Sequence, residues 1–383
     1  MSWWRSRRTR DVLFQAALLI GVALLIAAMA TNAIATMERQ RIASGFAFLD
    51  NTAGFDVIQT LVPYDESSTY GRVLLVGVLN TLLVAAIGIV LATLLGFVIG
   101  IGQLSSNWLI ARLCRVYVET LRNTPLLLQL FVWYFAVLRA LPYPRESWNL
   151  FDAAFLNNRG LYLPRPMPET DFGLVLIGLV AGVLAAVWFS MRSLEQREKT
   201  GQAPPTLPVN LALVVLPPLL VSAGLGFPLT FSMPVLAGFN FEGGVVVLPE
   251  LIALVVALAT YTASYIAEIV RAGIEGVAKG QREAAQAVGL TRGQTLRLVI
   301  VPQAMRQIVP PLTSQYLNLT KNSSLAVAIA YPDLVSVFAG TSLSQTGQAI
   351  EIIAITMGVY LTISLLTSAL MNWYNARIAL TER

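Results

Sequence analysis

Long apolar windows with almost no charged residues constrain this chain most. The stretches 72–102, 208–226 and 349–377 each run past 18 residues with few or no charges. About 20 apolar residues in a helix cross the roughly 30 Å of hydrocarbon in a bilayer, and a helix satisfies its own backbone hydrogen bonds there. Of the 383 residues 56% are hydrophobic and 12% charged, about half the charged share of soluble domains. The sequence therefore predicts an all-α, polytopic membrane protein.

The apolar windows predict about eight transmembrane helices. They cover residues 12–34, 72–102, 113–140, 172–191, 208–226, 248–271, 306–331 and 349–377. Four arginines precede the first span, namely Arg5, Arg7, Arg8 and Arg10. Because Lys and Arg concentrate in cytoplasmic segments, we expect a cytoplasmic N-terminus. An even number of spans returns the C-terminus to the cytoplasm, and it places residues 272–305 there too.

Composition excludes several classes of site. The chain has no histidine and one cysteine, Cys114, which rules out disulfides within the chain and His/Cys clusters for zinc, haem or iron–sulfur groups. The net charge of +5 is explained by cytoplasmic loops, so no nucleic-acid partner is expected. The first apolar stretch is long and lacks a clear cleavage site, which indicates a span and not a signal peptide. No metal site is predicted.

Residues 280–302, GQREAAQAVGLTRGQTLRLVIVP, are charged and helix-prone between two apolar spans. Gln281 to Val288 predict a short helix, and Gly289 is placed as its C-terminal stop. Thr291 and Gln294 then fit a capping box that begins a second helix. The pattern predicts a helix, a turn, and another helix that leads back into the bilayer.

The Ala284, Ala285 and Val288 side chains are expected to form a small, smooth surface on the first of these helices. Such a surface is suited to the groove of another protein. A plain connector is the alternative interpretation. Connections are usually about 4–6 residues long, and this one is far longer, which favours docking.

The same stretch resembles the "EAA" cytoplasmic loop of ABC-importer permeases. The matching positions are Glu283, Ala284, Ala285, Gly289, Val299, Val301 and Pro302, with Val at two places where the family more often has Ile and Leu. The resemblance implies that the loop is a coupling helix that docks on an ATP-binding subunit. The implied coupling residues are Arg282, Glu283, Ala284, Ala285, Gly289, Leu290 and Pro302.

Two further stretches resemble the polar amino-acid (His/Glu/Gln/Arg/opine) permeases. They are ETLRNTPLLLQLFVWYF at 119–135 and LTKNSSLAVAIAYPDL at 319–334. The resemblance covers about 71–139 and 248–378, and it implies a five-helix type I importer core. The expected parts are an N-terminal arm, first helix and periplasmic segment (1–70), the first part of the core (71–140), an inserted region with two extra helices (141–247) and the second part of the core (248–383). This enlarged layout is similar to general L-amino-acid and glutamate/glutamine/aspartate/asparagine permeases.

The resemblance also implies function and partners. We expect an inner-membrane subunit of a bacterial importer for polar L-amino acids, with a second permease chain (a related chain or a copy), two ATP-binding subunits and a periplasmic binding protein. No GxxxxGK[ST] motif occurs, so ATP and Mg belong on the partner and this chain is not itself an enzyme. An ion-coupled secondary transporter is the alternative. It is disfavoured because the sequence has no histidine, few mid-span acids and no evident repeat.

Polar residues inside the predicted 306–331 span predict part of the translocation path, because polar groups at membrane depth are costly. Gln315, Asn318 and Asn322 recur at helical spacing, with Lys321 beside them. Lys321 falls near the middle of this span, where its ammonium needs a carboxylate, carbonyls or water. Packing against a second permease subunit is the alternative role.

Two other spans carry candidate polar groups. Glu119 and Arg122 are placed to meet the ammonium and the carboxylate of an amino acid, or else to form a gate or interface salt bridge. A semi-polar stripe marks the 248–271 helix, comprising Tyr261, Ser264, Tyr265 and Glu268. Glu268 and Arg271 are three residues apart, and a simple ion pair at the helix end is the favoured interpretation.

Overall fold

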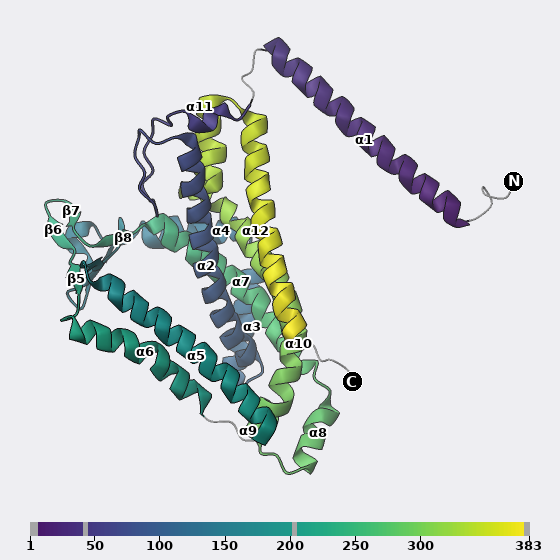
Figure 1. Ribbon diagram of the computed structural model, residues 1–383, viewed down its shortest axis with the longest axis vertical. Coiled ribbons are helices and arrows are strands. Elements are labelled where there is room, and N and C mark those ends of the chain that lie inside the picture. Colours follow the sequence, from purple (N-terminus) through teal and green to yellow (C-terminus); the bar gives the residue numbers. More distant parts are fainter. Residues whose placement is uncertain (1–6, 41–44, 201–204, 379–383) are drawn as a thin grey trace. The chain divides into compact units, whose positions relative to one another are not determined.

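The structure, a computed structural model, describes residues 7–40, 45–200 and 205–378. The predicted placements of Arg5 and of the last residues of the tail lie outside this part of the chain. Figure 1 draws the described residues as a ribbon. They belong to two compact units, residues 1–133 with 253–383, and residues 134–252.

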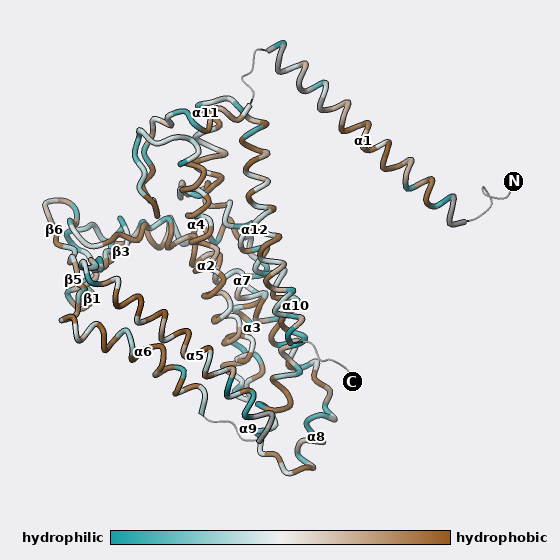
Figure 2. Tube along the Cα trace, in the orientation of Figure 1, coloured by the Kyte–Doolittle hydropathy of each residue, from teal (hydrophilic) through white to brown (hydrophobic). Residues whose placement is uncertain are grey.

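Helices long and apolar enough to cross a membrane dominate both units. Six do so singly: α1 (Arg7–Gln40), α2 (Tyr70–Gln103), α5 (Phe172–Thr200), α6 (Thr206–Gly224), α7 (Pro249–Glu275) and α12 (Ala349–Ile378). Two more spans are bent pairs of helices, which gives up to eight in the described residues. Figure 2 shows apolar residues running along these helices. The prediction of a helical polytopic protein is confirmed.

The predicted single helix 113–140 is wrong. Its residues form α3 (Trp108–Asn123), α4 (Leu126–Phe131) and a π-helical turn, η3 (Val132–Leu138). The helices on the two sides of the break are bent by 107°. Pro125 causes the break, because proline has no N–H and disfavours helical backbone at the residue before it.

Two of the carbonyl groups at this break accept hydrogen bonds from one side chain. The Gln129 amide donates to the Leu121 and Thr124 carbonyl oxygens at 2.9 and 3.0 Å. A buried carbonyl without a partner would be costly inside a membrane. The break is therefore a stable feature of this span.

The predicted span 306–331 also differs from the structure. A helical run begins much earlier and consists of α9 (Arg292–Thr295), η5 (Leu296–Ile300), α10 (Val301–Asn322) and η6 (Ser323–Ile329). After a break it continues, bent by 53°, as η7 (Leu334–Ser342) and α11 (Leu343–Thr346). Pro302 lies at the start of α10, where a missing N–H costs little.

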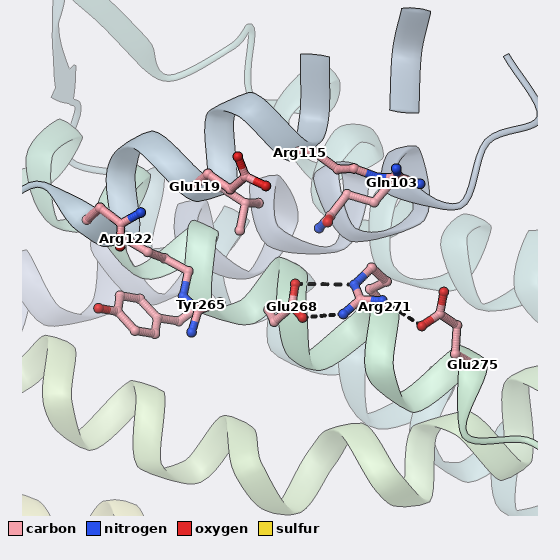
Figure 3. Close-up of a pocket in the computed structure, with 10 residues that line it drawn as sticks. Gln103, Arg115, Glu119, Arg122, Tyr265, Glu268, Arg271 and Glu275 are labelled. Carbon is pink, nitrogen blue, oxygen red and sulfur yellow. Dashed lines mark hydrogen bonds and ion pairs between the residues drawn. The ribbon is translucent and has the colours of Figure 1, made fainter. Parts of the chain in front are cut away.

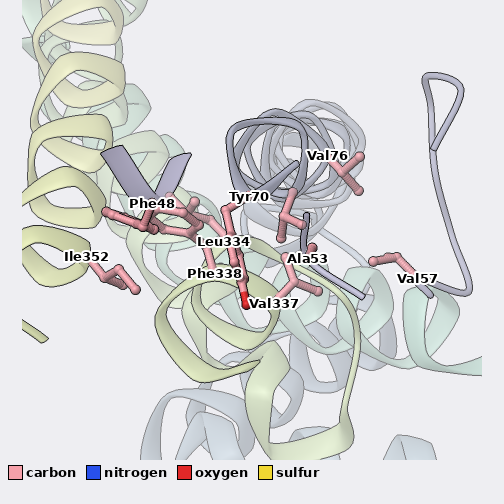
Figure 4. Packing of buried hydrophobic residues seen from close by; sticks show 10 residues of the cluster. Phe48, Ala53, Val57, Tyr70, Val76, Leu334, Val337, Phe338 and Ile352 are labelled. Atoms are coloured by element: carbon pink, nitrogen blue, oxygen red, sulfur yellow. The ribbon is translucent and has the colours of Figure 1, made fainter. Parts of the chain in front are cut away.

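This second break is held by α2. The Asn80 amide donates to the Pro332 carbonyl at 2.8 Å, and the Leu334 N–H donates to the Thr81 hydroxyl at 3.1 Å. A Cβ added at Gly77 would lie 2.8 Å from the Leu334 Cα, so only glycine permits this approach. The core of the first unit packs around the same place (Figure 4). It consists of Phe48 from η2 (Ala47–Asp50), Ala53, Val57, Tyr70, Val73, Val76, Leu334, Val337, Phe338 and Ile352.

The second unit contains short strands that the sequence did not predict. A four-stranded antiparallel sheet has the order β1 (Trp148–Leu150), β2 (Ala154–Asn157), β3 (Gly160–Leu163) and β8 (Val245–Val247). Two smaller pairs are β4 (Arg165–Pro168) with β5 (Leu229–Ser232), and β6 (Val235–Ala237) with β7 (Asn240–Glu242). Strands of three or four residues are too short to show a clear alternation in sequence. A 3-10 turn, η4 (Pro144–Glu146), precedes them.

The two long helices of this unit, α5 and α6, pack on each other. A Cβ added at Gly182 would lie 2.3 Å from the Leu213 carbonyl oxygen, so the two backbones approach closely at this glycine. The Asn210 amide donates to the Ser190 hydroxyl at 2.7 Å. The two extra helices predicted within 141–247 are thus an interacting pair.

Candidate functional site

One face of α3 carries three charged side chains. Arg115, Glu119 and Arg122 are spaced i, i+4, i+7, which puts them on one side of the helix. The Asn107 side chain caps the N-terminus of α3 by accepting from the Leu109 and Ile110 N–H groups. This cap fixes Trp108 as the first residue of the helix that carries the charged face.

The matching face of α7 carries a linked set of charges. Arg271 forms an ion pair with Glu268, and its Nη1 atom also lies 2.6 Å from Oε2 of Glu275. The predicted Glu268–Arg271 pair is confirmed. One turn earlier, the Tyr261 and Tyr265 hydroxyls lie 3.0 Å apart.

Contacts between α3 and α7 hold these faces together. The Tyr117 hydroxyl donates to the Thr260 carbonyl at 2.8 Å. The Arg122 guanidinium lies over the Tyr265 ring, 5.1 Å from its centroid. Glu119 and Arg122 do not form an ion pair with each other in the described structure, and a gate or interface salt bridge stays the alternative prediction for them.

A polar cavity of about 540 Å³ lies between these elements (Figure 3). Its lining residues are Gln103, Arg115, Val118, Glu119, Arg122, Asn123, Tyr265, Glu268, Arg271 and Glu275. Three arginines and three glutamates balance formally. The two glutamates of α7 share Arg271, which leaves Arg115, Arg122 and Glu119 as charges available to a ligand. The buried Gln103 side-chain nitrogen has no hydrogen-bond partner among the described residues.

This cavity brings together only part of the predicted path. Glu119 and Arg122 line it, whereas Gln315, Asn318, Lys321 and Asn322 do not. Lys321 is exposed and lies in the last turn of α10, not near the middle of a single helix as predicted. The difference arises because α10 ends at Asn322, where the 3-10 stretch η6 begins.

Sequence reasoning missed four lining residues: Gln103, Arg115, Val118 and Glu275. Arg115 was detectable, because it continues the Glu119 and Arg122 face by one turn toward the N-terminus. Gln103 ends α2 and Glu275 ends α7, and no spacing rule connects them. Within the described residues no group of three or more His, Cys, Asp or Glu is placed to hold a metal ion.

The segment between α7 and α10 has the predicted helix–turn–helix form. α8 (Lys279–Ala287) is followed by Val288 as its C-cap and then by Gly289, whose φ of +82° is a left-handed conformation that suits glycine. The Thr291 hydroxyl and Gln294 side chain form the predicted capping box at the start of α9. Both predictions are confirmed.

The exposed face of α8 is not the predicted surface of Ala284, Ala285 and Val288. Ala285 is only 4% exposed, so it faces inward, whereas Ala284 and Val288 are exposed. Glu283 and Ala287 are exposed with them. Helical geometry places these four residues on one side of α8 and Arg282, Ala285 and Gln286 on the other.

The chain matches known transport proteins along most of its length. Residues 88–380 match the family described as binding-protein-dependent transport system inner membrane component. The chain is 52% identical over 374 residues to the putative amino-acid ABC transporter permease protein YhdX of Escherichia coli (98% of this chain, 95% of that protein). It is 55% identical over 355 residues to the general L-amino acid transport system permease protein AapQ of Rhizobium johnstonii (93% and 88%). It is 41% identical over 407 residues to the glutamate/glutamine/aspartate/asparagine transport system permease protein BztB of Rhodobacter capsulatus (98% and 95%).

These matches define the class of protein as the permease of an ABC importer. The chain belongs to the family of binding-protein-dependent transport system inner membrane components. It is a multi-pass inner-membrane subunit and not an enzyme, because ATP hydrolysis resides in a separate subunit of such systems. An ATPase and a binding protein are its partners. The alternative of an ion-coupled secondary transporter is set aside.

Proposed function

We propose that this permease imports polar L-amino acids and that the cavity between α3 and α7 is part of their path. The observation that carries the proposal is the set of available charges in the cavity, two arginines and one glutamate. An α-amino acid has a carboxylate and an ammonium, and guanidinium groups bind carboxylates through two parallel hydrogen bonds. Relatives named for general L-amino acids and for glutamate, glutamine, aspartate and asparagine support this substrate class.

In this proposal Arg122 receives the substrate carboxylate and Glu119 receives the ammonium. The Tyr265 ring under Arg122 holds the guanidinium in place by a cation–π contact. Arg271 keeps Glu268 and Glu275 occupied, so those acids do not compete for the substrate ammonium. Gln315, Asn318, Lys321 and Asn322 remain proposed for another section of the path or for contact with the second permease chain.

We further propose the orientation in which both termini and α8 face the cytoplasm. Arginines before the first span and in the segment 272–305 support this orientation. The complex would contain a second permease chain, either a related chain or a copy, two ATP-binding subunits that hold ATP and Mg, and a periplasmic amino-acid-binding protein.

The coupling role is assigned to the exposed face of α8. This face has mostly small side chains and is suited to a groove of the ATP-binding subunit. It consists of Glu283, Ala284, Ala287 and Val288. Gly289, Leu290 and Pro302 set the turn and the start of the following helix, so they act by positioning α8. Movement of α8 with the ATPase would then reach the spans through the helical run that starts at Arg292.

Reconstitution of the complete transporter tests the substrate path. Arg122→Gln should lower amino-acid uptake at least tenfold, which corresponds to the loss of about 1.4 kcal/mol, while the complex still assembles. Arg145→Gln, in the second unit, is the matched control and should leave uptake unchanged. Normal uptake by the Arg122 variant, or equal loss in both variants, would contradict the assignment.

Cross-linking tests the docking face separately. In a Cys114→Ser background, a cysteine at Ala284 or Val288 should cross-link to the ATP-binding subunit, and a cysteine at exposed Ser344 should not. Cross-linking from position 344 alone would overturn the proposed orientation.

A further inference from the structure

A second, larger hollow lies in the first unit beside α8. Its volume is about 860 Å³. The end of α2 and the start of α3 form one side, and α8, α9 and η5 form the other. Both apolar and charged side chains line this groove, among them Val98, Ile101, Leu296, Arg282 and Arg292.

One wall of the groove is apolar and continues the surface of a membrane span. Val98 and Ile101, on α2, are 70% and 56% exposed, and Leu296, across the groove, is 53% exposed. Exposed apolar side chains at the end of a transmembrane helix are normally covered by lipid. This wall is thus suited to an acyl chain.

The other part of the groove carries two arginines, Arg282 and Arg292. Neither has an ion-pair partner among the described residues. Glu275 also lines the groove, but it is paired with Arg271. The free charge of the groove is therefore positive, and an anion is the complementary ligand.

We propose that this groove binds one anionic phospholipid, with its phosphate on Arg282 and Arg292 and an acyl chain along Val98, Ile101 and Leu296. An apolar wall that leads to two guanidinium groups matches a lipid with a charged headgroup better than it matches a soluble anion. The site lies on the side of α8 opposite to Glu283, Ala284 and Val288. Lipid and an α8 partner therefore do not compete for the same face, and bound lipid would fix α8 against the ends of α2 and α7.

The experiment uses the complete transporter in nanodiscs of phosphatidylcholine mixed with phosphatidylglycerol. Native mass spectrometry of the released complex measures which lipid is retained. The double variant Arg282→Gln/Arg292→Gln should weaken phosphatidylglycerol retention about 30-fold, at about 1 kcal/mol for each arginine. The control, Lys279→Gln/Arg297→Gln, removes the same charge from exposed positions outside the groove and should retain the lipid.

Two further arms separate lipid from free phosphate. Leu296→Gln should lower phosphatidylglycerol retention, and millimolar inorganic phosphate should not displace the lipid. Displacement by inorganic phosphate would show a simple anion site and overturn the proposal. Equal retention of phosphatidylcholine, or equal loss in the control variant, would overturn it too.

Discussion

Two membrane-length helices, α7 and α6, have similar hydropathy but different surroundings. In the most apolar 18-residue window of α7, 61% of the residues are buried within the described structure, whereas none are buried in that of α6. The difference lies in the small residues. α7 has fully buried alanines at 253, 257, 263 and 267, and small residues let neighbouring backbones approach in membranes.

The comparison shows what each sequence signal reports. High hydropathy predicts that a helix lies in the membrane. Recurring small and polar residues predict that the helix is buried against other parts of the protein. Glu268 and Arg271, at the end of α7, belong to the cavity, while α6 has no charged residue. The following substitutions test this difference, and each pairs a site in the first unit with one on α5 or α6 where the chain offers it.

Overpacking should have the largest effect. Gly100→Leu on α2 would put a Cβ 2.7 Å from the Ala267 carbonyl oxygen of α7, so the two helices must separate, at a cost of about 3 kcal/mol. Gly224→Leu, at the end of α6, meets no atom within 4 Å and should be tolerated. Thermal unfolding of the purified complexes measures both. Equal melting temperatures for the two variants would contradict the importance of close α2–α7 packing.

Removing a buried side chain should have the next largest effect. Leu258 on α7 is 1% exposed and Leu220 on α6 is 67% exposed. Leu258→Ala should cost about 2 kcal/mol, because it leaves a cavity. Leu220→Ala should cost under about 0.5 kcal/mol, because lipid fills the space. A similar loss for both, in unfolding of the assembled complex, would show that α6 is covered by a partner.

Breaking the ion pairs of Arg271 with Glu268 and Glu275 should have a smaller effect on stability and a clear effect on transport. Arg271→Gln leaves Glu268 and Glu275 without their shared cation, at a cost of about 1 kcal/mol for partly exposed pairs. We expect slower uptake, because the freed carboxylates attract the substrate ammonium. Arg271→Lys, which keeps the charge, is the control. Uptake measured in proteoliposomes should fall in the first variant and largely recover in the second.

The smallest effect is expected from a polar contact between α5 and α6, the hydrogen bond from Asn210 to Ser190. Asn210→Leu removes its hydrogen bond to Ser190 and should cost about 0.6 kcal/mol, a typical value for such bonds in membranes. Uptake should not change. A loss of uptake with little loss of stability would instead assign the α5–α6 pair a role in transport.

The sequence predicted the spans and the segment 280–302 well because these depend on local signals. Hydropathy located the membrane helices, and Gly289, Thr291 and Gln294 predicted the turn and the cap. The breaks at Pro125 and after Ile329 were not predicted from the sequence. Pro125 was visible, but the apolar run on both sides of it favoured one continuous helix. The cavity was half predicted: Glu119 and Arg122 came from one helix, but their union with Gln103 and Glu275 depends on how α2, α3 and α7 pack. Ala285 was assigned to the wrong face because a nine-residue helix gives no hydrophobic stripe long enough to orient it.

Gln129 at the corner between α3 and α4 has a mechanical consequence. Since Pro125 has no N–H, straightening this corner would break the Gln129 contact to the Leu121 carbonyl and leave that carbonyl without a backbone partner. The bend between α3 and α4 should therefore keep its angle through the transport cycle. Whatever opens and closes the path must bend the chain somewhere else.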